Sequence, residues 1–222
     1  MKKKTTNKNK HFLKTLKNIP PEKIIAVTKK QPIDKVDLAL SHNINKIGEN
    51  QVQETQKKFH NYKNREKIEL HFIGKLQSNK INKAVEIFDV IQTIENIKQI
   101  KKIGNKAKEL KKIQKIYIQI NISKDPKKSG ANTEHIRALC ENIKKEKNLK
   151  LCGLMTILKE DLDDEEILKY YKKTKKIQEN ILKKNKNCKE VSMGMSGDFK
   201  LAIQAGATQV RLGTVLFGKR KK

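Results

Sequence analysis

Short apolar runs alternate with longer, charged runs along the 222 residues, and this alternation constrains the fold more than any other feature. The apolar runs have the length and isoleucine content of buried strands, whereas the charged runs between them suit helices. Such alternation is typical of βαβ units around a parallel sheet. Eight strands are predicted, at residues 24–27, 46–48, 70–73, 90–93, 116–120, 152–155, 190–192 and 209–212.

Helices fill the gaps between these strands. Examples are residues 33–41, with Pro32 just before the first turn, residues 132–147, and residues 163–184, with acids early and lysines late. Eight strands with eight helices close naturally into a (β/α)8 (TIM) barrel, so we expect one α/β barrel domain over residues 1–222, with a basic, frayed N-terminus at about residues 1–10. An open doubly wound sheet is the main alternative, because strand number alone does not show closure.

The formal net charge of +28 raises the question of a polyanionic partner. Lysine supplies nearly all of this charge, whereas arginine, the usual bidentate reader of phosphate and guanine, is rare. The lysines are spread along every helix, and the accompanying excess of asparagine and isoleucine indicates a nucleotide-composition bias. We therefore interpret the charge as a solvated surface that binds no specific nucleic acid, although nonspecific, salt-sensitive binding would follow.

The cysteines and the N-terminal segment bear on the compartment. Cys140, Cys152 and Cys188 are odd in number and lack C-x-x-C spacing, which argues against a disulfide framework and a zinc knuckle. No long apolar stretch precedes Pro20, so the sequence predicts neither a signal peptide nor a membrane anchor. We expect a soluble, cytoplasmic protein with no membrane partner.

Polar residues and glycines collect directly after the predicted strands. In a barrel these positions share the C-terminal rim, where barrel enzymes place their ligands and often hold a phosphate with the loops after strands seven and eight. Lys29 ends the first run, at the mouth of an apolar barrel, where desolvation favours the neutral, nucleophilic amine. The alternative is that Lys29 extends to solvent, as other lysines do.

The two last loops suit an anion. Small and hydroxyl residues at 192–198 and 210–214 let backbone amides approach closely, with a hydroxyl from Ser196, amides from Gly213 and Thr214, and the positive end of a helix beginning near Asp198. The glycines could instead only make tight turns. Arg211 lies within the last strand and should point into the barrel, either to serve a ligand or to form a salt bridge with Glu49.

These residues lie in motifs through which residues 24–218 resemble the pyridoxal phosphate homeostasis protein family, whose fold is similar to the barrel domain of alanine racemase. The motifs are AVTK (26–29), IGENQVQE (47–54), HFIGKLQSNK (71–80), QINIS (119–123), KSG (128–130), GLMTI (153–157), SMGMSGD (192–198) and VRLGT (210–214).

The resemblance implies that pyridoxal 5'-phosphate (PLP), the vitamin B6 cofactor, is held as a Schiff base, an aldimine on Lys29. It also implies that Arg211 faces the pyridine nitrogen. The implied phosphate ligands are Ser196, Gly213 and Thr214, and the implied pocket lining is Asn50, His71, Ser78 and Met193. The sequence departs from the family's usual text at Gln51, Lys75 and Gly197, and the last two leave the loop geometry beside the phosphate open.

The function that follows is PLP homeostasis without robust catalysis: the protein would buffer the cofactor or deliver it to PLP-dependent apo-enzymes. A pyridine nitrogen that faces Arg211 stays neutral, which supports carbanion chemistry weakly. A racemase of the related fold also uses a tyrosine from a further domain, and this sequence ends at Lys222, directly after the barrel. A PLP-dependent racemase or lyase is the second hypothesis, and a basic nucleic-acid-binding protein is the third. An open barrel mouth favours a monomer.

Overall fold

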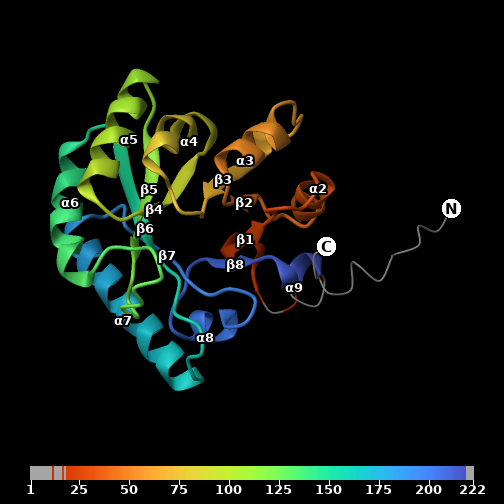
Figure 1. The fold of residues 1–222 in the computed structure, drawn as a ribbon. Coiled ribbons are helices and arrows are strands. Elements are labelled where there is room, and N and C mark those ends of the chain that lie inside the picture. The colour runs from red at the N-terminus through yellow and green to blue at the C-terminus, as the bar shows by residue number, and fades with distance from the viewer. Residues whose placement is uncertain (1–11, 13–16, 18, 219–222) are drawn as a thin grey trace.

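A computed structural model describes residues 12, 17 and 19–218, and it confirms the predicted (β/α)8 barrel. Eight parallel strands lie in the order β7-β6-β5-β4-β3-β2-β1-β8, with helices around them (Figure 1). The segment predicted to be frayed, residues 1–10, lies outside the described residues. The strands are β1 (Ile24–Val27), β2 (Lys46–Glu49), β3 (Glu69–Phe72), β4 (Val90–Ile94), β5 (Gln114–Ile120), β6 (Leu149–Thr156), β7 (Glu190–Ser192) and β8 (Val210–Leu212).

The helices follow the strands in the expected alternation. The longest, α7, begins after Asp163, whose side chain accepts a hydrogen bond from the amide of Glu166, and α5 begins after Asn96 in the same way. Within the described residues, no helix has the length and apolar character needed to cross a membrane. The α-helices are α2 (Asp34–Leu40), α3 (Val52–Phe59), α4 (Ile81–Ile87), α5 (Ile97–Glu109), α6 (Ile136–Lys145), α7 (Asp164–Lys184), α8 (Phe199–Gln204) and α9 (Thr214–Phe217). The 3-10 helices are η1 (Pro21–Lys23), η2 (Arg65–Lys67), η3 (Ser78–Lys80) and η4 (Thr133–His135).

The sheet closes on itself at two places. Strand β1 pairs with β8, and Ala26 lies opposite Leu212. Between β7 and β8 there is an isolated bridge from Ser192 to Gln209, and the amide of Arg211 donates to a carbonyl in the loop after β7 at 2.9 Å. Apart from the closing pair of β1 and β8, strands that are neighbours in space are neighbours in sequence, whereas an open doubly wound sheet reverses its strand order.

Side chains alternate between the two faces of each strand, and this alternation produces two hydrophobic cores. Residues such as Ile24 and Ala26 face outward and join the large core beneath the helices. Val90, Tyr117 and Met155 form a second, smaller cluster from the other strand faces, inside the barrel. The face on which a residue lies thus decides whether its side chain meets the helices or the interior of the barrel.

Candidate functional site

Lys29 follows β1 at the C-terminal end of the barrel. It is half-buried, whereas Lys30 beside it is exposed. Because Ile24 and Ala26 face the helices, strand alternation puts Val27, and Lys29 after it, on the barrel side of the chain. The position of Lys29 therefore agrees with an amine at the barrel mouth. Of the two adjacent lysines, it is Lys30 that extends to solvent.

The residues on either side of this lysine are both fastened to α3. The hydroxyl of Thr28 donates to Glu49 Oε1 at 2.6 Å, and Lys58 of α3 donates at 2.8 Å both to that oxygen and to the Thr28 carbonyl. On the other side, the amide of Lys30 donates to Glu54 of α3 at 2.8 Å. The chain is thus hydrogen-bonded on both sides of Lys29, at Thr28 and at Lys30, which fixes the backbone from which the Lys29 side chain extends.

Glu49 is the electrostatic centre of this arrangement. Its carboxylate is fully buried, Oε1 accepts two hydrogen bonds, and Oε2 has no hydrogen-bond partner among the described residues. Burial raises the pKa of Glu49, and the charge and hydrogen bond of Lys58 oppose that rise. Sequence reasoning missed the role of Lys58, although a charged residue at the end of an apolar strand was a signal that Glu49 needed a partner.

The loops after β7 and β8 meet beside the end of β1. Ser196 Oγ accepts a hydrogen bond of 3.4 Å from the amide of Val215, in the first turn of α9. A Cβ atom at Gly213 would lie 3.4 Å from the carbonyl oxygen of Val27, so the loop after β8 lies against β1. The structure therefore brings together the predicted phosphate ligands Ser196, Gly213 and Thr214, next to the strand that carries the lysine.

The loop that carries Ser196 is braced from behind. Gly194 has a φ of 88°, and a Cβ atom there would lie only 2.5 Å from the Cβ of Ala202, so glycine is required for both reasons. Asp198 accepts hydrogen bonds of 2.6 Å from the amide of Met195 and from the hydroxyl of Tyr171. This carboxylate joins the loop to α7 and is committed to structural hydrogen bonds.

Arg211 is buried on the barrel side of β8, as predicted. Its guanidinium donates to the carbonyl and the hydroxyl of Ser192 at 2.8 and 3.0 Å and to the carbonyl of Thr156 at 2.9 Å. Burial lowers the pKa of Arg211. The alternative of a salt bridge with Glu49 is not observed, because that carboxylate faces outward from β2 and pairs with Lys58.

His71 lies deeper than the rim. It is fully buried, with Nε2 at 2.9 Å from a Glu69 oxygen and Nδ1 at 2.9 Å from Gln92 Nε2. Burial by itself would raise the pKa of Glu69, but hydrogen bonds and charge from His71 and Lys115 lower it to about 2. Both ring nitrogens of His71 are therefore engaged in a polar network inside the barrel.

The other predicted lining residues have different surroundings. Asn50 is half-buried at the rim, and its backbone lies against Gly74, where a Cβ atom would overlap the Asn50 carbonyl. Met193 is fully buried in the core between strands and helices. Ser78 is exposed at the start of η3, and its carbonyl accepts a hydrogen bond from Lys102. The three residues thus have different environments: Asn50 is half-buried, Met193 lies in the core beneath the helices, and Ser78 is at the surface.

The three positions at which the sequence differs from the family's common motifs are exposed. Gln51 precedes α3, and its carbonyl accepts hydrogen bonds from the amide and hydroxyl of Thr55. Lys75 is exposed in the loop after β3. Gly197 is exposed, and a Cβ atom there would meet nothing within 4 Å, so the loop beside Ser196 does not depend on a glycine at that position.

The chain is a (β/α)8 barrel in which a lysine directly follows β1 and the loops after β7 and β8 meet beside that strand. Residues 6–221 match the family model for the alanine racemase N-terminal domain. The "pyridoxal phosphate homeostasis protein" of Synechocystis sp. is 37% identical over 211 residues, covering 94% of this chain and 97% of that protein. The chain belongs to the pyridoxal phosphate homeostasis protein family.

Solved structures support the same assignment. The structure of PipY from Synechococcus elongatus without PLP superposes with a TM-score of 0.89 at 30% identity, covering 95% of this chain and 100% of that one. The structure of the same protein with PLP bound has a TM-score of 0.85 at 29% identity, covering 94% and 99% of the two chains.

Proposed function

We propose that this protein binds PLP through an imine formed with Lys29 and takes part in the homeostasis of the vitamin B6 cofactor. One observation carries this proposal: the loops that contain Ser196 and Gly213 meet beside β1. Lys29 directly follows β1, on the barrel side of the chain. The relative whose structure is described with PLP bound has the same barrel over nearly the whole chain.

The residues fit the group chemically. Lys29 is half-buried as a residue, and an amine that is desolvated at the mouth of an apolar barrel favours the neutral form that attacks an aldehyde. A phosphate needs several hydrogen-bond donors, and the hydroxyls of Ser196 and Thr214 and the amides at the start of α9 lie in the two loops that meet at the rim. When bound, PLP supplies an aldehyde and an electron-withdrawing ring.

Arg211 has a role that depends on its rigidity. Three hydrogen bonds hold its guanidinium to the ends of β6 and β7, so it cannot swing away from the barrel interior without leaving buried carbonyls unpaired. A permanently charged group at this place keeps a nearby pyridine nitrogen unprotonated. We therefore propose that the cofactor is held for buffering or delivery and is not strongly activated as an electron sink.

A catalytic role would also need a second acid or base at the reacting centre. Three tyrosine hydroxyls have partners elsewhere: Tyr62 binds Asp37, Tyr117 binds Gln209 inside the barrel, and Tyr171 binds Asp198. We expect no release of the α-deuterium of labelled amino acids beyond the rate with free PLP. Release at enzymatic rates would favour the racemase or lyase hypothesis instead.

We place this activity in the cytoplasm and expect a monomer that passes PLP to PLP-dependent apo-enzymes. In support of a reducing compartment, Cys140, Cys152 and Cys188 are all free thiols. Burial raises the pKa of Cys140 to about 11 and that of Cys188 to about 12, so both are poor nucleophiles at neutral pH.

The direct test of the proposal is borohydride trapping. Incubation with PLP, reduction and proteolysis should give one pyridoxyl adduct, and mass spectrometry should locate it on Lys29. An adduct spread over many surface lysines, in proportion to their exposure, would contradict a built site.

Ser196→Ala tests the phosphate end. Loss of one hydroxyl that can donate to a phosphate should weaken PLP binding about tenfold, because a hydrogen bond to a charged group contributes about 1.5 kcal/mol or more. Equilibrium titration followed by absorbance measures the change. Ser41→Ala, at the opposite end of the barrel after α2, serves as the control and should leave the dissociation constant unchanged.

A further inference from the structure

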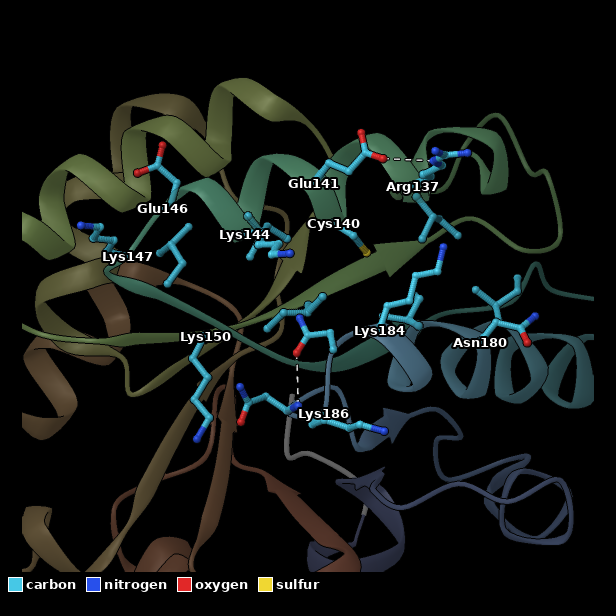
Figure 2. A pocket seen from close by; sticks show the side chains of 18 residues that line it. Arg137, Cys140, Glu141, Lys144, Glu146, Lys147, Lys150, Asn180, Lys184 and Lys186 are labelled. Atoms are coloured by element: carbon cyan, nitrogen blue, oxygen red, sulfur yellow. Dashed lines mark hydrogen bonds and ion pairs between the residues drawn. The ribbon is translucent and has the colours of Figure 1, made fainter.

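A groove of about 800 Å³ lies on the outside of the barrel between α6 and α7 (Figure 2). It extends from the first turn of α6 to the loops that precede β6 and β7, away from the rim that carries Lys29. Half-buried Cys140, Ile177 and Ile181 form part of its apolar floor, beside more deeply buried aliphatic residues of α6 and β6. The two helices thus leave apolar surface accessible between them.

The edges of this groove are positively charged. Figure 2 shows lysines extending from both helices and from the adjoining loops. The cationic lining residues are Arg137, Lys144, Lys147, Lys150, Lys184 and Lys186, and the acidic ones are Glu141 and Glu146.

The two acids do not neutralise the lysines. Glu141 pairs with Arg137 on the same helix at 3.0 Å. Glu146 leans toward α5, since a Cβ atom at Gly104 would lie 2.5 Å from its Oε2. Within the described part of the chain, none of the five lysines that line the groove forms an ion pair. An uncompensated positive field therefore surrounds an apolar floor.

These two properties together specify the occupant. The chain's own termini are excluded, because residues 1–10 and 219–222 are rich in lysine and would be repelled, and a second copy of a chain with net charge +28 is disfavoured for the same reason. A nucleic acid would satisfy the lysines but not the isoleucines. We propose that the groove binds an acidic amphipathic helix of a partner protein, with its apolar stripe on the floor and its carboxylates toward the lysines.

A synthetic peptide tests this without knowledge of the natural partner. The probe is a fluorescein-labelled 18-residue helix with leucines at i, i+3, i+4 and i+7 spacing and glutamates at most other positions. Its control has the same composition in an order that places the leucines all around the helix. At physiological ionic strength, the amphipathic peptide should bind about tenfold more tightly than its control by fluorescence anisotropy, because only it presents both faces.

Variants locate the site. Lys144→Gln/Lys147→Gln/Lys184→Gln should weaken peptide binding about tenfold, whereas Lys98→Gln/Lys101→Gln/Lys108→Gln, which removes the same charge from exposed positions of α5, should change it less than about twofold. Ile181→Ser should weaken binding, and Ile113→Ser, at an isoleucine that is 55% exposed outside the groove, should not.

Thiol labelling gives a readout on the unmodified chain. In mildly alkaline buffer, where a thiol of raised pKa ionises in part, bound peptide should slow alkylation of Cys140, which lines the groove, and leave alkylation of the other partly exposed cysteine, Cys152, unchanged. The proposal is wrong if the two peptides bind equally, if both lysine triples weaken binding alike, if Cys140 is not protected, or if a DNA duplex of equal charge displaces the peptide as well as unlabelled peptide does. PLP should not alter peptide affinity, so failure here leaves the cofactor proposal intact.

Discussion

Lys29→Ala should abolish the pyridoxyl adduct that borohydride fixes, because the neighbouring lysine, Lys30, is exposed to solvent and the amine of Lys58 is paired with Glu49. The expected result is a fall from about one adduct per chain to the level of random surface labelling, together with loss of the yellow colour of the reconstituted protein. Mass spectrometry of the reduced protein and its absorbance spectrum measure the two effects separately.

The matched control is Lys30→Ala. It removes an adjacent lysine while it keeps the Lys30 backbone amide that Glu54 accepts, so adduct formation should be unchanged. Equal adduct yields from the wild type and Lys29→Ala would remove the basis of the proposed function. Circular dichroism on both variants shows whether a loss of adduct reflects a loss of folding.

Lys58→Met should produce the largest loss of stability among substitutions around the site. The change leaves the Glu49 carboxylate fully buried with only the Thr28 hydroxyl as a partner, and an uncompensated buried charge costs about 3 kcal/mol of unfolding free energy. Denaturant titration at pH 7 measures this cost. Lys57→Met, at an exposed position one residue earlier on α3, should change stability by less than about 0.5 kcal/mol.

The pH dependence identifies the cause. Burial already raises the pKa of Glu49 above its ordinary value of 4.5, and loss of Lys58 raises it further. The folded state then holds the proton more tightly than the unfolded chain, so stability falls as pH rises from about 4.5 toward the folded-state pKa. The destabilisation should therefore be small in acid and grow toward neutrality. Adding Glu49→Gln should recover most of it, and a pH-independent loss would contradict this account.

Much of the fold could be predicted because strand alternation and helix composition agree along the chain. β1 and β7 begin and end at the predicted residues, and α7 begins one residue after Asp163, the residue that caps it. β6 begins at Leu149, three residues earlier than predicted, and its first three residues alternate between buried Leu149, exposed Lys150 and buried Leu151. The predicted helix at 132–147 is split, since η4 occupies its first turn and Glu146 is extended.

The candidate site was predicted in part, and the remainder follows from which face each side chain occupies. Glu49 could not be matched with Arg211 or Lys58 from sequence alone, because its partner depends on the packing of α3 against β2. Strand alternation could have shown that Met193, two residues after outward-facing Val191, lies beneath the helices. The partners of His71 come from strands β3 and β4, whose relative register is set only in the folded barrel.

The pairing of β1 with β8 has a consequence for the order of events during synthesis. Lys29 leaves the ribosome early, but Gly213 and Thr214 follow the last strand, and until that strand emerges one edge of β1 has no partner in the sheet. A nascent chain thus carries the amine long before it carries the phosphate ligands. PLP binding therefore requires the complete barrel. A truncated chain that ends before β8 would expose both Lys29, without its phosphate ligands, and an unpaired edge of β1.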